Sequence, residues 1–386
     1  MSGVPETAAD PRPSPPPERP DPLPMVVGPT RPHPSVLRRM ARAADPIDAP
    51  SSVRDLRRAL VLTRRLLGAP AALPFALPGT GTAGMESLAA SLLAPGAPVL
   101  VASTGMWGDR WRDICLRLGV PAHAHTCAPG RAPDPGEVGR RLAAEPHQAL
   151  LLTHVDSSSG VRTPVAELAG VARAHGALVL VDGISAAGAE DVRQEVWGVD
   201  AYLTSTPKAL GIPAGLYLAA LGPRAADALR ARTWAPRHYS LDLRGWAPVM
   251  RAALEGRFAY HQSLPGNLIG ALAEGLELVV EEGRERVRRH RRLALRLRSA
   301  LDAEGLANLV ADDRDRANGV SVYRTPPGLT TGELLRGAAG HGVLLQAGTH
   351  PRAAEETFRV GHLGNVDEHD IDRTADALRR LLAPRE

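Results

Sequence analysis

Short apolar runs alternate with helical patterns through the middle of the chain, and this alternation constrains the fold more than any other feature. Strand-like runs occur at 98–102, 149–153, 177–181, 201–204 and 216–221, and helical patterns at 85–93, 110–118, 134–144 and 164–174. Strands that are apolar along their whole length are buried on both faces, which is typical of parallel sheets covered by helices. The alternation therefore predicts a large α/β domain built on a mainly parallel sheet.

The remaining segments predict an N-terminal arm and a second, smaller domain. Residues 1–24 are rich in proline and should form a disordered arm, because they can build neither a helix nor a core. Residues 25–266 make up the predicted large domain, and residues 267–386 a linking helix and a smaller α+β domain. Outside the alternating region, helices are expected at 35–44, 52–67, 267–304, 331–340 and 368–382, and strands at 320–323, 343–346 and 358–362.

Charge and cysteine content exclude several classes of protein. The net charge of +4 is mild and no basic run is interleaved with aromatic residues, so we expect no nucleic-acid partner. Two cysteines, Cys115 and Cys127, are too few for a disulfide scaffold or an all-cysteine zinc site, and no metal site is predicted. The sequence has no apolar run of membrane-spanning length and no signal-peptide pattern. We therefore expect a cytoplasmic protein without a membrane partner.

Lys208 is the only lysine of the sequence, since the other 45 of its 46 basic residues are arginines. Arginine does not lose its proton in proteins, whereas lysine can do so and then act as a nucleophile. In a chain that uses arginine wherever a positive charge is enough, a remaining lysine is a candidate for amine chemistry. A single lysine retained by chance is the alternative, and the surroundings of Lys208 bear on the choice.

Polar or aromatic side chains follow four of the predicted strands. In chain order these are Trp107, then His154, Asp156, Ser157 and Ser158, then Asp182, and finally Lys208. The carboxyl ends of parallel strands meet at one edge of a sheet, where α/β proteins bind ligands. Each group alone is compatible with an ordinary turn or helix cap. The convergence of four such loops predicts a binding site. One of them contains a carboxylate, Asp182, that would be costly to bury without a cationic partner.

A glycine- and threonine-rich segment, 79–84, leads into the helical pattern at 85–93. Small residues let the backbone approach an anion, and a helix N-terminus offers unpaired N–H groups and a positive dipole. The segment is therefore a candidate phosphate site, although a simple capped turn has the same composition. It is neither a Walker A loop nor a dinucleotide fingerprint, because the spacing differs and the lysine is absent.

Taken together, these motifs resemble the class V, fold-type I enzymes that use pyridoxal phosphate. The similarity is greatest to the branch of alanine–glyoxylate and serine–pyruvate aminotransferases, and it extends from about Gly28 to the C-terminus. Beside the glycine-rich loop, it is carried by 105–110, 153–161, 181–182 and 208–210. The resemblance implies a large domain with a seven-stranded, mainly parallel sheet, a smaller C-terminal α+β domain, and a homodimer whose active site is shared between subunits.

The resemblance also implies a role for each residue that would face the cofactor ring. Lys208 would hold the cofactor aldehyde as a Schiff base and later shuttle the proton. Asp182 would pair with the protonated pyridine nitrogen and keep the ring an electron sink. Trp107 would stack on the ring, and Ser157 would donate or accept a hydrogen bond beside it.

Further roles concern the phosphate and the substrate. Three residues of the glycine-rich loop would bind the phosphate, namely Thr80, Gly81 and Thr82. Two further residues, Tyr260 and Ser263, would reach the phosphate of the neighbouring subunit. Arg359 would clamp the substrate carboxylate, for which a planar guanidinium is suited. The chain departs from the branch at Pro207, which stands where glutamine is usual, and at Thr82, where some members have histidine. The first departure should remove one hydrogen bond to the cofactor.

Three functions remain open on these residues. The first is an aminotransferase that acts between a small α-amino acid, similar to alanine or serine, and an α-keto acid such as glyoxylate or pyruvate. The second is a lyase or desulfurase on the same cofactor, although a desulfurase needs a reactive cysteine and neither Cys115 nor Cys127 is well placed. The third is a binding protein without activity, which would have no use for the pair Lys208 and Asp182.

Overall fold

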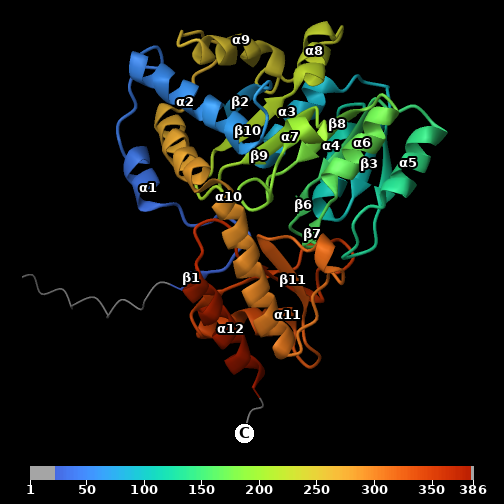
Figure 1. Ribbon diagram of the computed structural model, residues 1–386, viewed down its shortest axis with the longest axis vertical. Helices are drawn as coiled ribbons and strands as arrows, with labels where there is room; N and C mark the ends of the chain where they lie inside the picture. Colours follow the sequence, from blue (N-terminus) through green and yellow to red (C-terminus); the bar gives the residue numbers. More distant parts are fainter. Residues whose placement is uncertain (1–21, 384–386) are drawn as a thin grey trace, which may run out of the picture.

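The computed structural model describes residues 22–383, which form a large domain and a smaller one joined by a long helix (Figure 1). Of the predicted arm, residues 1–21 lie outside the described residues. Its last residues are part of the fold, because β1 (Leu23–Pro24) pairs in parallel with β12 (Val343–Leu344). The Leu23 side chain is buried in the core of the smaller domain, so ordered structure begins earlier than the sequence predicts.

A seven-stranded sheet forms the centre of the large domain and confirms the predicted α/β architecture. Its strand order is β2-β10-β9-β8-β5-β3-β4, and only β10 runs antiparallel to its neighbours. The strands are β2 (Leu73–Pro78), β3 (Val99–Ser103), β4 (Ala122–Thr126), β5 (Ala149–Thr153), β8 (Leu178–Asp182), β9 (Ala201–Ser205) and β10 (Leu216–Leu221).

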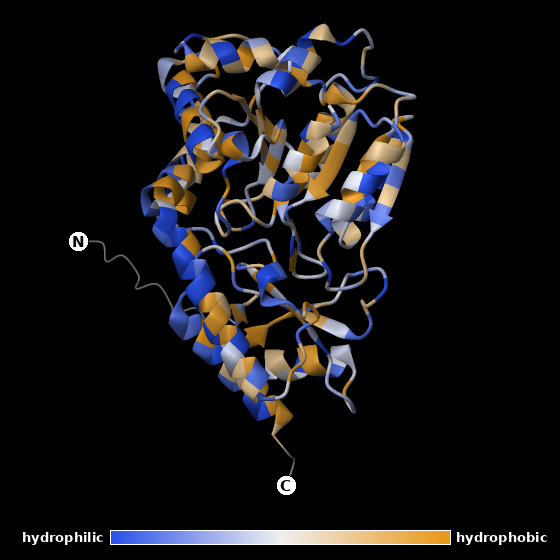
Figure 2. Cartoon of the chain, turned by 45° about the vertical axis from the view of Figure 1, so that its right-hand side comes forward, coloured by the Kyte–Doolittle hydropathy of each residue, from blue (hydrophilic) through white to orange (hydrophobic). Residues whose placement is uncertain are grey.

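Different helices cover the two faces of this sheet, because side chains alternate between faces along each strand. In β5, Leu151 packs in one core cluster while Leu150 and Leu152 pack in another. The first face is covered by α2 (Pro50–Leu66), α3 (Gly81–Leu92), α4 (Met106–Arg117), α8 (Pro223–Ala231) and α9 (Leu243–Leu254), and the second by α5 (Pro135–Ala144) and α6 (Val165–Ala174). Burial on both faces explains the continuous apolar runs, which Figure 2 shows as strands in the hydrophobic colour.

Several elements differ from those that the sequence predicts. The sequence pattern did not predict the edge strand β4, because His123 and His125 interrupt its apolar run. It did not predict the helices α8 and α9 either. The helices α3 and α4 begin about one turn earlier than expected, because the glycine-containing segments before them already belong to their first turns. Short elements complete the domain: α1 (Pro34–Met40), β6 (Val155–Asp156), β7 (Val161–Arg162) and α7 (Gln194–Trp197).

The helix α10 (Gly266–Ala303) runs from the large domain into the smaller one, with a kink at Gly283, whose backbone is not helical (Figure 1). The smaller domain has the three-stranded antiparallel sheet β11-β14-β13. Its elements are η1 (Asp313–Asp315), β11 (Val320–Arg324), α11 (Thr331–Gly340), β13 (Gln346–Ala347), β14 (Thr357–Gly361) and α12 (Glu368–Leu382). The single strand expected at 343–346 is thus divided between β12 and β13. None of the helices within residues 22–383 combines the length and apolarity needed to cross a membrane.

Candidate active site

The carboxyl ends of the parallel strands meet at a cavity that contains about 670 Å³ of empty space, part of it open to solvent. Six of the residues predicted from the sequence line it: Thr80, Gly81, Thr82, Trp107, Asp182 and Lys208. They come from loops that follow different strands, as the convergence of carboxyl ends requires. The structure therefore brings the amine, the carboxylate, the indole and the glycine-rich loop to one place.

Lys208 follows β9 and is held against the N-terminal segment of the chain. Its Nζ donates to the carbonyl oxygen of Val27 at 2.6 Å, and its own carbonyl accepts from Thr30 Oγ1 at 2.6 Å. Gly28 fits here because its φ is +127° and a Cβ would lie 2.9 Å from Lys208 Nζ. Burial, followed by the positive charge of Arg359, lowers the pKa of Lys208 to about 8, against a smaller opposing effect of Asp182. The amine is thus partly neutral near physiological pH.

Asp182 is the last residue of β8 and is buried. Its Oδ1 accepts a hydrogen bond from the backbone N–H of Ile184 at 2.9 Å. Burial raises the pKa of this carboxyl to about 7, and the nearby Asp156 adds to the effect, whereas Lys208 and Arg110 oppose it. Asp182 lines the cavity, and among residues 22–383 no basic side chain forms an ion pair with it. A cationic group bound in the cavity would therefore stabilise the carboxylate.

Trp107 lies in the first turn of α4 and is fixed by the turn that follows β5. Its Nε1 donates to Ser157 Oγ at 2.8 Å, and its backbone N–H donates to Asp156 Oδ2 at 3.2 Å. The other carboxylate oxygen of Asp156 accepts from the backbone N–H and the hydroxyl of Ser158, at 2.9 and 2.6 Å. Asp156 and Ser157 therefore orient the indole.

His154 takes no part in the cavity. Its Nδ1 lies 2.8 Å from the hydroxyl of Tyr202, and its ring is in edge contact with those of Trp197 and Tyr202. Complete burial lowers its pKa to about 3, so the imidazole stays neutral and serves the packing behind the site.

The glycine-rich loop forms the N-terminus of α3. Thr80 is the N-cap, and its hydroxyl accepts from the backbone N–H of Ala83 at 3.2 Å. A Cβ on Gly81 would lie only 2.4 Å from Ile184 Cδ1, so a larger residue here would require the Ile184 side chain to move. The first N–H groups of a helix have no acceptor within it and are suited to an anion. The geometry thus matches a phosphate site.

Arg110 is a site residue that the sequence reasoning missed. Its Nη1 donates to Thr82 Oγ1 at 3.1 Å, and its guanidinium carbon lies 4.7 Å from the centre of the Trp107 ring. Arg110 therefore links the glycine-rich loop to the indole of Trp107. The sequence contained one indication of this role. Arg110 follows Trp107 by three residues, and this spacing places both side chains on one face of a helix.

Arg359 approaches the site from the smaller domain. It lies in β14, where its Nε donates to the carbonyl oxygen of Ala347 at 2.8 Å and its Nη1 contacts that of Ser157 at 3.5 Å. Burial lowers its pKa, with an opposing effect of Asp156. Its charge influences the pKa of Lys208, so a ligand between the two basic groups would meet both.

Tyr260 and Ser263 do not lie at the cavity of their own chain. They belong to the exposed connection between α9 and α10, and 62% of Tyr260 is accessible. Tyr260 instead lines a separate hollow together with Ile47 and Leu264.

The comparisons with known proteins agree with this geometry. The profile of the aminotransferase class-V family matches residues 62–233. An L-aspartate–glyoxylate aminotransferase of Paracoccus denitrificans is 31% identical over 89% of this chain and 87% of its own length. An alanine–glyoxylate aminotransferase of Oryctolagus cuniculus is 31% identical over 81% of this chain and 80% of its own. The crystal structure of an alanine–glyoxylate aminotransferase from Nostoc sp. superposes with a TM-score of 0.89 at 27% identity, covering 96% of this chain and 98% of that one.

Proposed function

The chain belongs to the class V aminotransferase family, and we propose that it uses pyridoxal phosphate to move an amino group between a small α-amino acid and an α-keto acid. The donor would be similar to alanine or serine and the acceptor to glyoxylate or pyruvate. The proposal rests chiefly on one observation: Lys208, the only lysine of the sequence, and the buried carboxyl of Asp182 line the same cavity.

The residues of the cavity fit this cofactor. Trp107 offers a flat face, Asp182 a carboxyl for a protonated ring nitrogen, and Lys208 an amine for the aldehyde. Gly81 packs closely against Ile184 at the N-terminus of α3, and the unpaired N–H groups of this first turn would hold the phosphate. When bound, pyridoxal phosphate supplies an electron sink for the bonds of the substrate α-carbon.

Lys208 has the protonation behaviour that proton transfer at the substrate α-carbon requires. Because its pKa lies near 8, the amine can take up a proton and release it again at neutral to mildly basic pH. Its Nζ lies in a site closed on one side by Val27 and Gly28, which limits access of water. Asp182 provides the negative charge that keeps a ring nitrogen protonated.

Arg359 would orient the substrate by its carboxylate. A guanidinium binds a carboxylate through two parallel hydrogen bonds, which fixes direction as well as position. The hydrogen bond from Nε to Ala347 holds the side chain in the wall between the domains. The amino group of a substrate anchored there would point toward the large domain and Lys208.

A desulfurase reaction is disfavoured by the state of the two cysteines. Both Cys115 and Cys127 are buried, and burial raises the pKa of each thiol to about 12. Neither is a thiolate at neutral pH, and a thiol is a poor nucleophile. Both are also free of disulfides, which supports our proposal of a reducing compartment such as the cytoplasm.

We also propose a homodimer in which Tyr260 and Ser263 of one subunit reach the phosphate of the other. Their exposed position, away from the cavity of their own chain, supports this arrangement. Light scattering combined with activity tests the proposal, since a monomer with full activity would contradict it.

Replacement of the lysine tests the proposed reaction. Lys208→Ala should abolish transfer of the amino group to glyoxylate or pyruvate while still permitting phosphate-anchored binding of the cofactor. Lys208→Arg is the matched variant, because it keeps the positive charge but cannot deprotonate. We expect it to be equally inactive, and transamination by either variant at a rate near that of the unaltered protein would refute the proposal.

A further inference from the structure

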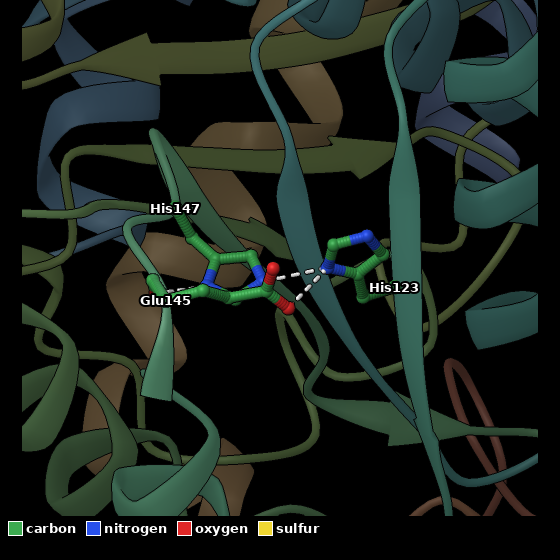
Figure 3. A group of neighbouring side chains, drawn as sticks. All are labelled: His123, Glu145 and His147. Atoms are coloured by element: carbon green, nitrogen blue, oxygen red, sulfur yellow. Dashed lines mark hydrogen bonds and ion pairs between the residues drawn. The ribbon is translucent and has the colours of Figure 1, made fainter. Parts of the chain in front are cut away.

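A second cluster of reactive side chains lies far from the proposed active site. His123 lies in the first half of β4, while Glu145 and His147 belong to the connection between α5 and β5 (Figure 3). In the parallel pairing of β3 with β4, His123 stands opposite Leu100, near the amino end of both strands. The cluster therefore occupies the edge of the sheet opposite to the carboxyl edge, at which Lys208 lies.

Three ligand atoms converge in this cluster. His123 Nδ1 lies 2.8 Å from Glu145 Oε1 and 3.1 Å from His147 Nε2, and the last two atoms are 3.7 Å apart. A zinc ion with bonds of about 2.0–2.1 Å in tetrahedral geometry holds its ligand atoms about 3.3 Å from one another. The three distances lie on both sides of this value and within about 0.5 Å of it, so the ligand atoms are spaced closely enough to share one zinc ion.

The buried histidine is oriented for binding a metal. The side chain of His147 is only 1% exposed, and its Nδ1 lies 2.9 Å from the carbonyl oxygen of Glu145. A neutral imidazole that donates from Nδ1 presents an unprotonated Nε2, here to the centre of the cluster. Such a hydrogen bond to the second ring nitrogen is the usual support of a histidine ligand.

The other two ligands complete the donor set and leave a path for the ion. Figure 3 shows the second ring nitrogen of His123 pointing away from the cluster, so this nitrogen can carry the proton while Nδ1 binds. The side chains of His123 and Glu145 are 43% and 53% exposed and line an open hollow, so a metal can enter without unfolding. Two imidazoles and one carboxylate form a donor set that zinc prefers.

We propose that His123, Glu145 and His147 bind one zinc ion per chain, with water in the fourth position. The ion would tie the edge strand β4 to the connection before β5, and so would stabilise the fold without taking part in amino transfer. The sequence did not predict this site, because His123 lies 24 residues before His147 and the spacing matches no metal motif.

Titration of the untagged, cofactor-loaded protein with zinc chloride tests this proposal by calorimetry and thermal unfolding. We expect one zinc ion to bind per chain and the melting temperature to rise. His123→Gln and Glu145→Gln should each weaken binding by more than the roughly 10- to 100-fold that loss of an outer-shell partner causes. His125→Gln is the matched control, because His125 lies on the same strand but pairs with Glu137 at 3.4 Å. It should bind zinc normally.

Cobalt provides an independent measurement, since tetrahedral Co²⁺ absorbs in the visible range. The bands should appear in the unaltered protein and in His125→Gln, and should be absent from His123→Gln and Glu145→Gln. Transaminase activity should be the same in all four proteins with or without zinc, which also shows that the variants are folded. The proposal is overturned if the unaltered protein does not bind zinc or if His123→Gln binds it equally well.

Discussion

The pKa of Lys208 is the most direct electrostatic prediction of the structure. Burial of the amine, with the charge of Arg359 as the second cause, lowers this pKa from 10.5 to about 8. At pH 8 about half of the Lys208 amines would then be neutral, compared with about 0.3% for an ordinary lysine. The buried site therefore increases the amount of reactive amine roughly 150-fold at this pH.

A single lysine makes this prediction measurable without assignment work. Labelling of the cofactor-free protein with ¹³C-lysine produces one ε-methylene signal, whose chemical shift follows protonation of Lys208 as the pH is raised. We expect a midpoint near pH 8. A midpoint at pH 10 or above would refute the reasoning, because it would mean that the amine is not buried as the structure shows.

Two variants separate the contributions to this midpoint. Arg359→Gln removes a charge that lowers the pKa of Lys208, so the midpoint should move upward. Asp182→Asn removes a charge that raises it, so the midpoint should move downward. A general disturbance of the fold would not move the two midpoints in opposite directions. Equal shifts of the same sign would therefore contradict the arrangement of the three groups.

Other expectations concern single residues of the site. Asp182→Asn keeps the shape of the side chain but not its charge, so kcat should fall about 100- to 1,000-fold while the cofactor stays bound, as steady-state rates and visible absorption would show. Arg359→Gln should raise the KM of the amino acid roughly 10- to 100-fold through loss of charged hydrogen bonds, and an unchanged KM would exclude Arg359 as the anchor. Arg110→Ala should weaken cofactor binding in equilibrium dialysis, because Thr82 and Trp107 lose their common partner; unchanged affinity would contradict this role.

Much of the large domain was predictable because its strands are buried on both faces. The run before Asp182 is apolar throughout, and burial of Val179 and Val181 on one face of the sheet and of Leu180 on the other shows why. The same regularity allowed Asp182 and Lys208 to be placed at one sheet edge. Composition indicated that the glycine-rich loop could bind a phosphate, whereas resemblance to known enzymes assigned the stacking role of Trp107. The structure places both beside Asp182 and Lys208.

Features that depend on contacts between distant segments were not predictable from local patterns. Lys208 meets Val27, which lies 181 residues earlier, and Arg110 meets Thr82 in another helix. The strand β4 lies at the edge of the sheet, where apolar residues are not required on both faces. His123 and His125 therefore interrupt the apolar run by which a strand would have been predicted. The kink at Gly283 leaves the helical pattern of the sequence intact on both sides and therefore gave no signal.

One measurement tests the central claim most directly, namely that Lys208 and its neighbours carry out amino transfer. The cofactor-loaded protein is mixed with an amino acid such as alanine or serine in the absence of any keto acid. We predict that the visible absorption of the bound cofactor is lost as one equivalent of keto acid per chain is formed, without release of ammonia, and that glyoxylate restores it. Continuous formation of keto acid together with equal amounts of ammonia would contradict the account and indicate a lyase.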